Sequence, residues 1–230
     1  MVDRQEKRPL TVWVTRARPG AEATAARLET AGFVPTVSPL LEVQALPAEI
    51  DLTGIDALAF TSRNAVAAFA ALTPDRDRPV FVVGASTARA ATEAGFAQVR
   101  SADGDLIALA GLIAGQGRGL SILHPAAARP AGDLGTLVGD AAQVRAVSVY
   151  ETVETRGSPP EAWDTVLIHS PRAGHALAMT SPEVRGRVAC AISPAAAAPL
   201  ANMPFAEVRI AASPTEEALL AALGKPGPGV

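Results

Sequence analysis

Short apolar runs alternate along the chain with longer alanine-rich segments whose apolar positions recur at helical spacing. The runs at 10–15, 56–61 and 79–84 predict strands, and the segments 20–32 and 62–72 predict helices. Further strands are expected at 33–37, 97–102, 119–124, 141–153, 163–169, 187–193 and 205–211. Further helices are expected at 86–95, 106–114, 130–139, 170–179, 194–201 and 215–223. Apolar strands separated by helices are typical of a parallel sheet covered on both faces, so the pattern predicts an α/β fold.

Two helix boundaries carry explicit signals. Gly32 follows the first predicted helix and is expected to end it, because glycine adopts the left-handed conformation that closes helices. Ser86 opens the predicted helix 86–95 and is expected to be its N-cap, with Gly95 as the stop.

An internal repeat covers much of the chain. The segment 56–72 matches 164–180, and the segment 82–100 matches 191–209 at a spacing one residue longer. The first strand–helix unit has a weaker counterpart at 120–139. The sequence therefore predicts a duplicated α/β unit with about five strands in each copy.

Two segments fall between the repeat units and are natural linkers, near 38–50 and 149–163. Tyr150, the single tyrosine, lies at the start of the second linker, so we expect it beside a ligand site rather than in a core. A lone tyrosine at a strand end is more often packing, and that alternative stays open. The repeat alone also allows a simple division into successive halves near residue 117.

Composition narrows the class of protein. Apolar residues make up 49% of the chain, enough for a substantial core, and the net charge of −3 gives no reason to expect nucleic acid or an anionic membrane as partner. Residues 1–9 lack the apolar stretch of a signal peptide, and no segment approaches the ~20 apolar residues of a membrane span. We therefore expect a cytoplasmic protein. Cys190, the single cysteine, lies in an apolar run and is expected to be a buried thiol.

Polar side chains gather where predicted strands give way to helices. In parallel α/β sheets these junctions form the carboxyl edge, where helix N-termini present free N–H groups to ligands. Most junctions carry serine or threonine, a residue type that is usually an N-cap there. Several also carry arginine, at Arg16, Arg18, Arg63, Arg129 and Arg172. Hydroxyls, helix N-termini and guanidinium groups on one edge suit a ligand with many carboxylates or phosphates.

Competing motifs are absent from the sequence. No G-x-G-x-x-G follows a strand, and the chain has neither a Walker loop nor a G-x-S-x-G elbow. His124, His169 and His175 lack metal-ligand spacing, so no metal site is expected. His124 and His169 are expected to end strands, where capping or packing is the commoner role.

An ordered series of segments resembles the uroporphyrinogen-III synthase family. The series comprises VWVTRARPGAEATAARLETAGF, DALAFTSRNAVAAF, VFVVGASTARAATEAGF, VSVYET, TVLIHSPRAG and ASPTEEALLAAL. The likeness runs over about residues 10 to 223 in register. The chain departs from the family at ISPAAAAPL, where a glycine and threonines are usual and this sequence has Ser193, Ala195 and Ala196.

The resemblance implies two flavodoxin-like domains joined by a two-stranded linker, with a cleft between them. Residues 1–39 plus 154–230 would form one discontinuous domain, and residues 40–153 the other. The implied reaction is the cyclisation of hydroxymethylbilane, a linear tetrapyrrole with eight carboxylates, in haem biosynthesis. Water is lost, ring D is inverted and no cofactor is used, which makes the enzyme a cyclising hydro-lyase. The resemblance also suggests a monomer, with hydroxymethylbilane synthase as the candidate upstream donor.

The resemblance also assigns roles to individual residues. Tyr150 matches the family's tyrosine that donates to the departing hydroxyl, and a phenol is protonated at neutral pH and can donate. Thr87 and Ser62 match hydroxyls that line the family's cleft, and Ser170 and Arg16 match likewise. With the other junction residues, the candidate substrate-binding set is Arg16, Ser62, Arg63, Asn64, Gly84, Ser86, Thr87, Arg129, Ser170, Arg172 and Ser193.

Two other functions compete with the synthase. A non-catalytic tetrapyrrole or anion sensor of the same fold is the main alternative, and the missing threonines favour it. A two-domain solute-binding protein is disfavoured by the N-terminal sequence.

Overall fold

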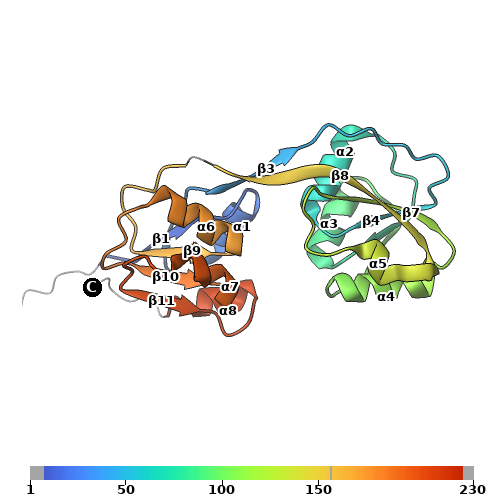
Figure 1. Ribbon diagram of the computed structural model, residues 1–230. Helices are drawn as coiled ribbons and strands as arrows, with labels where there is room; N and C mark the ends of the chain where they lie inside the picture. Colours follow the sequence, from blue (N-terminus) through green and yellow to red (C-terminus); the bar gives the residue numbers. More distant parts are fainter. Residues whose placement is uncertain (1–7, 156, 225–230) are drawn as a thin grey trace, which may run out of the picture. The chain divides into compact units, whose positions relative to one another are not determined.

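The computed structural model describes residues 8–155 and 157–224, which fall into two compact units (Figure 1). Unit 1 combines the chain up to Glu42 with the chain from Val153 onward, and unit 2 is Val43–Thr152. The chain therefore passes between the units twice.

Unit 1 contains a five-stranded sheet with the order β11-β10-β9-β1-β2, and all its neighbours are parallel. The strands are β1 (Thr11–Val14), β2 (Val34–Val37), β9 (Thr165–Ile168), β10 (Val188–Ala191) and β11 (Glu207–Ile210). Numbered within the unit, the order is 2-1-3-4-5, that of flavodoxin. Because β1 pairs with β9, the sheet joins both ends of the chain, which excludes a division into successive halves near residue 117.

Unit 2 contains a six-stranded sheet with the order β3-β8-β7-β4-β5-β6. The strands are β3 (Leu41–Ala45), β4 (Ala57–Phe60), β5 (Val80–Val82), β6 (Val99–Ser101), β7 (Ser121–Ala127) and β8 (Gln143–Glu154). The strands from β4 to β8 pair in parallel. The edge strand β3 runs antiparallel to β8, since Leu46 N–H donates to Val149 O while Thr155 N–H donates to Leu40 O.

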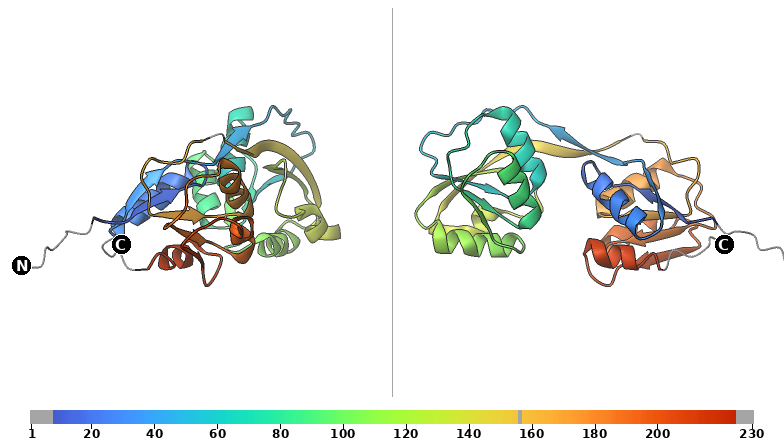
Figure 2. Two further views of the ribbon diagram at one scale, coloured as in Figure 1. Left: turned by 60° about the vertical axis from the view of Figure 1, so that its left-hand side comes forward. Right: turned by 180° about the vertical axis from the view of Figure 1, so that it is seen from behind.

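Helices cover both faces of each sheet (Figures 1 and 2). Those of unit 1 are α1 (Gly20–Thr30), α6 (Pro171–Thr180), α7 (Pro194–Ala197) and α8 (Glu216–Ala221). Those of unit 2 are α2 (Arg63–Leu72), α3 (Ala85–Glu93), α4 (Leu106–Gln116) and α5 (Leu134–Val138). Short 3₁₀ turns follow α5 and α7. Along β4, Leu58 and Phe60 pack with α2 and α3, whereas Ala57 and Ala59 pack with α4 and α5. This alternation is the two-residue period of a strand buried on both sides.

The two units repeat each other in space as well as in sequence. Read from edge to edge, β6-β5-β4-β7-β8 of unit 2 matches β11-β10-β9-β1-β2 of unit 1. The registers agree too, because Val12 pairs with Thr165 in unit 1 while Ile122 pairs with Ala57 in unit 2. Matching positions in the two units can therefore be compared residue by residue.

Most predicted helix boundaries hold, and two details are corrected. Gly32 follows α1 at φ +85°, as expected for a closing glycine. Ser86 is not an N-cap: α3 starts at Ala85 after Gly84, which leaves Ser86 exposed in the first turn. His124 does not end a strand, because β7 continues to Ala127. Cys190 is fully buried, as predicted, and burial raises the pKa of its thiol to about 12.

Candidate functional site

Each sheet has a point at which the strand order reverses, and in α/β proteins ligands bind at the carboxyl ends of the strands there. In unit 1 this switch point lies between β1 and β9, and in unit 2 between β7 and β4. The candidate residues fall on the carboxyl edges around these two points.

The carboxyl edge of unit 1 gathers four of the candidates. Arg16 follows β1, Ser170 and Arg172 follow β9, and Ser193 follows β10. Ser170 Oγ accepts from Ala173 N–H at 3.1 Å and Ser193 Oγ accepts from Ala196 N–H at 3.3 Å. Both serines are thus N-caps, and each hydroxyl hydrogen can still be donated elsewhere.

A charged cluster joins four elements at the same edge. Glu216, the first residue of α8, accepts from Arg16 Nη1 at 3.0 Å and from Thr24 Oγ1 at 2.5 Å. His169 Nε2 lies 3.2 Å from the same carboxylate, and Arg27 lies further out at 3.8 Å. Only 16% of the Glu216 side chain and 7% of the His169 side chain are exposed.

Protonation in this cluster follows from burial and contacts. Burial alone would raise the pKa of Glu216, but the close approach of His169, the hydrogen bond from Thr24 and the charge of Arg16 lower it to about 2. Burial lowers the pKa of His169 against the opposing pull of Glu216. Glu216 is therefore a carboxylate at neutral pH and His169 is neutral. Neither ring nitrogen of His169 has a well-oriented hydrogen-bond partner in the described part of the chain, so the 3.2 Å approach of Nε2 to Glu216 is a close contact.

The carboxyl edge of unit 2 holds a neutral pair at the matching place. Thr61 Oγ1 lies 3.3 Å from His124 Nε2, and His124 is 3% exposed. Burial lowers the pKa of His124 from 6.5 to about 4, although Asp133 opposes the shift. Next to this pair, Ser62 caps α2 by accepting from Asn64 N–H at 3.1 Å.

The remaining candidates in unit 2 differ in exposure. Arg63 and Asn64 are partly exposed in the first turn of α2, and Arg129 is exposed after β7. Gly84 precedes α3 without a side-chain cap. Thr87, in contrast, is only 2% exposed.

Tyr150 lies on β8, level with Ala127 at the end of β7. Its backbone carbonyl accepts from Ala128 N–H at 2.8 Å. The residue is 8% exposed and belongs to the core formed with Phe60 and Val149, so the expectation that it lies outside a core is wrong for the ring. The hydroxyl makes no hydrogen bond among the described residues, and 8% of the Tyr150 surface is exposed. The ring is thus packed in the core of unit 2, at a residue that lies level with the carboxyl end of β7.

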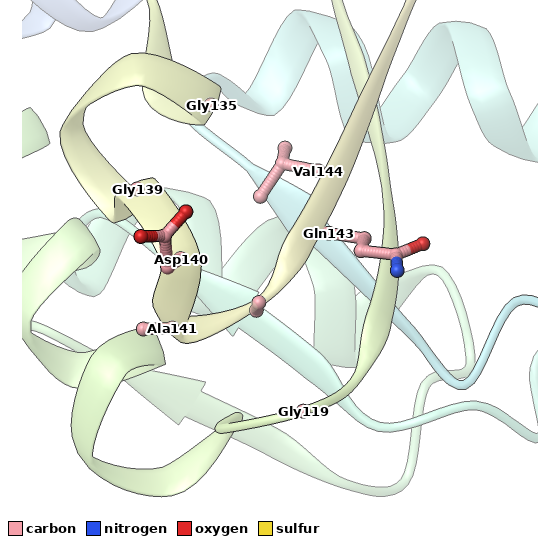
Figure 3. A pocket seen from close by; sticks show the side chains of 8 residues that line it. Gly119, Gly135, Gly139, Asp140, Ala141, Gln143 and Val144 are labelled. Carbon is pink, nitrogen blue, oxygen red and sulfur yellow. The ribbon is translucent and has the colours of Figure 1, made fainter.

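A shallow pocket of about 490 Å³ lies at the opposite edge of unit 2 (Figure 3). Figure 3 shows it between the turn at Gly139 and Asp140, Gly119 and the start of β8 at Gln143 and Val144. Apart from Asp140 and Gln143 its lining is apolar side chains and backbone. It contains none of the candidate residues.

Across residues 8–155 and 157–224, no three His, Cys, Asp or Glu side chains converge on a possible metal position. No helix in those residues is long and apolar enough to cross a membrane.

Sequence reasoning missed Glu216 and Thr24, which complete the cluster around Arg16. The repeat, continued beyond residues 100 and 209, would have signalled the difference. It sets Glu216 against Leu106, an apolar residue, in unit 2. Thr61, at the end of the predicted strand 56–61, was not singled out, whereas the structure pairs it with His124.

Two doubly wound α/β units with polar groups at their switch points define a class of protein that binds small molecules at the carboxyl edge of its sheets. A family model described as uroporphyrinogen-III synthase HemD matches residues 22–221. The chain belongs to the uroporphyrinogen-III synthase family, which confirms the resemblance seen in the sequence.

Solved structures agree on the fold. Uroporphyrinogen-III synthetase from Helicobacter pylori is 20% identical, with a TM-score of 0.64 over 94% of this chain and 98% of that one. A mutant uroporphyrinogen III synthase from Thermus thermophilus is 18% identical, with a TM-score of 0.52 over 93% and 97%. A comparison with curated protein sequences gives no match.

Proposed function

We propose that this protein is a uroporphyrinogen-III synthase that cyclises hydroxymethylbilane, with inversion of ring D and loss of water, without a cofactor. The observation that carries the proposal is the gathering of hydroxyl and guanidinium groups at the carboxyl edges of a chain of this family. A substrate with eight carboxylates needs many such donors, and arginine and helix N-termini supply charge-assisted hydrogen bonds.

The chemistry assigned to Tyr150 is proton donation to the leaving group. As the C–O bond of the hydroxymethyl group breaks, the phenol delivers a proton and the group departs as water, leaving an azafulvene cation. The substituted carbon of the last ring attacks this cation and forms a spiro intermediate. Reopening and reclosing at the other carbon, followed by loss of a ring proton, gives the III isomer. One water leaves in the net reaction.

Positioning contributes more to this reaction than proton transfer. Well-oriented intramolecular reactions gain roughly 7–11 kcal/mol from proximity, whereas a general acid adds about 10²–10⁴-fold. Unassisted closure gives isomer I, so the essential task is to hold the disfavoured carbon near the cation. The packed ring of Tyr150 supports its role as proton donor, because the surrounding core fixes the rotamer and so holds the hydroxyl in one place.

The reaction is tested with freshly generated hydroxymethylbilane and separation of the oxidised uroporphyrin isomers. We expect isomer III in excess over the uncatalysed background. Isomer I alone would overturn the proposal. Retained binding of the substrate in that case would favour the sensor, the alternative suggested by Ala195 and Ala196.

Tyr150→Phe tests the hydroxyl separately from the packing. We expect it to fold normally, because the ring and its core contacts remain, and to lower kcat by about 10²–10⁴-fold. The control is Tyr150→Leu, which also removes the ring and should in addition lower the melting temperature. An unchanged kcat in Tyr150→Phe would return the residue to packing alone.

A further inference from the structure

The helices α8 and α4 occupy matching places in the two units and differ at their first residue. Each follows the edge strand of its sheet, β11 or β6, and each is capped by a side chain that accepts from the N–H three residues on. The buried positions align, since Leu109 and Leu219 are both fully buried. This alignment places Glu216 of unit 1 where unit 2 has Leu106.

Both residues contact the loop at the switch point of their sheet. Leu106 approaches the β7–α5 loop so closely that a Cβ on Gly132 would lie 2.7 Å from its Cδ2. Glu216 contacts the corresponding β1–α1 loop through Arg16, and α1 itself through Thr24. The contact between the start of this helix and the loop at the switch point is thus apolar in unit 2 and ionic in unit 1.

The ionic contact of Glu216 is not required for the helix to pack against the loop. Taking charges out of water opposes folding, and replacing a buried ion pair by a well-packed apolar residue is often neutral or stabilising. In unit 2, Leu106 makes the corresponding contact in the same architecture. The carboxylate in unit 1 therefore needs a reason other than packing.

We propose that Glu216 is a positioning residue for substrate binding: it fixes the guanidinium of Arg16 at the carboxyl edge of unit 1. This inference rests on the proposed function, in which that edge receives substrate carboxylates. Arginine has a long side chain whose ordering upon binding lowers affinity, and holding it beforehand removes that loss. Oε2 of Glu216 contacts Arg16 and His169 while Oε1 accepts from Thr24, so both oxygens are used.

Positioning and simple electrostatics predict opposite results. If Glu216 merely reduced the positive charge of the edge, its removal would strengthen binding of a polyanion. If Glu216 holds Arg16 in place, its removal weakens binding. The sign of the change in KM therefore decides between them.

The experiment compares Glu216→Gln with Glu216→Leu, which installs the residue of unit 2, and with the exposed neighbour Glu217→Gln as control. For both Glu216 variants we expect KM for hydroxymethylbilane to rise about five- to tenfold, with kcat within threefold of the parent, because the reacting ring is not touched. Glu217→Gln should change neither constant. An unchanged or lower KM in a folded Glu216 variant overturns the inference, as does an equal loss confined to kcat.

Folding and the proposed function are checked independently. Both tryptophans, Trp13 and Trp163, lie in unit 1, so their fluorescence reports whether that unit has folded in each variant. If the parent protein makes no isomer III, the proposed function fails, and the inference is then tested by equilibrium binding of uroporphyrin III, which carries eight carboxylates. A five- to tenfold weaker binding by Glu216→Gln would uphold it; equal binding, or none by the parent, would overturn it.

Discussion

Gly174 of unit 1 and Val66 of unit 2 occupy matching positions on α6 and α2, yet only one of them carries a side chain. A Cβ on Gly174 would lie 2.5 Å from the carbonyl oxygen of Ala196, so α7 approaches α6 at backbone contact. Val66 is 1% exposed and fills the corresponding space between α2 and α3. One fold thus closes the same face by two means, backbone approach in unit 1 and side-chain packing in unit 2.

The carboxyl edges differ in a parallel way. Position 169 of unit 1 matches position 61 of unit 2, and these hold His169 in a charged cluster and Thr61 in a neutral pair. Duplication has kept the backbone and the serine N-caps of α2 and α6, while the residues at the switch points have diverged in charge. Strand order therefore identifies where a ligand would bind, and the side chains at that place decide what chemistry each unit contributes.

Replacing Gly174 of α6 by the valine found at the matching position of α2 should give the largest effect on stability. Gly174→Val introduces the residue of unit 2 and must push α7 away, so we expect it to destabilise unit 1 by about 3 kcal/mol or more, with Gly174→Ala at about 2 kcal/mol. Tryptophan fluorescence during urea unfolding measures this change in unit 1. Val66→Ala in unit 2 is the control and should leave the tryptophan transition in place. An unaltered midpoint for Gly174→Val would mean that α7 is not held against α6.

The two carboxyl edges should lose stability in different pH ranges. The pKa of Glu216 is lowered by folding from 4.5 to about 2, so its contribution, about 2 kcal/mol, is present above pH 4.5 and is lost as pH falls towards 2. The pKa of His124 is lowered from 6.5 to about 4, so its contribution is present above pH 6.5 and is lost as pH falls towards 4.

Two variants separate these ranges. Glu216→Gln should flatten the decline of unit 1 stability between pH 4.5 and 2, followed by tryptophan fluorescence. His124→Asn should flatten the decline between pH 6.5 and 4, followed by far-ultraviolet circular dichroism. Retention of the full slope in either variant would assign that slope to other groups.

The smallest effect on stability should come from removing the serine N-cap that α2 and α6 share. Ser62→Ala and Ser170→Ala each remove an N-cap at matching positions, and we expect each to destabilise its own unit by about 1 kcal/mol. Threonine at either position should restore most of the loss, since its hydroxyl also caps. A difference above about 1 kcal/mol between the two alanine variants would show that one serine does more than cap.

The alternation of strands and helices was predictable because each strand is buried on both faces and reads as an apolar run. His124 was misplaced at a strand end because the sequence after it, Pro125 and a run of alanines, resembles a loop, whereas β8 pairs alongside and extends β7 to Ala127. Ser86 was assigned as a cap on residue type, but Gly84 adopts the extended conformation that starts α3 two residues earlier.

The residues of the candidate site could be predicted in outline, but the contacts between their side chains could not. The junction residues after each strand could be named because the carboxyl edge of a parallel sheet collects them. The pairing of Arg16 with Glu216 joins residues 200 positions apart, and no local pattern signals such a contact. The burial of Tyr150 was likewise hidden, since its ring packs under α2 and α3 only once β8 lies beside β7.

The pairing of β1 with β9 has a consequence for synthesis on the ribosome. Unit 2 is contiguous and is complete when residue 152 has emerged, whereas unit 1 must wait for β9, β10 and β11. During that interval Val12, Trp13 and Val14, which are fully buried in the finished protein, have β2 as their only neighbouring strand and α1 as their only helix among the described elements. β1 therefore leaves the ribosome before the whole of unit 2 and is enclosed only after it, so its apolar side chains need protection from aggregation during that interval.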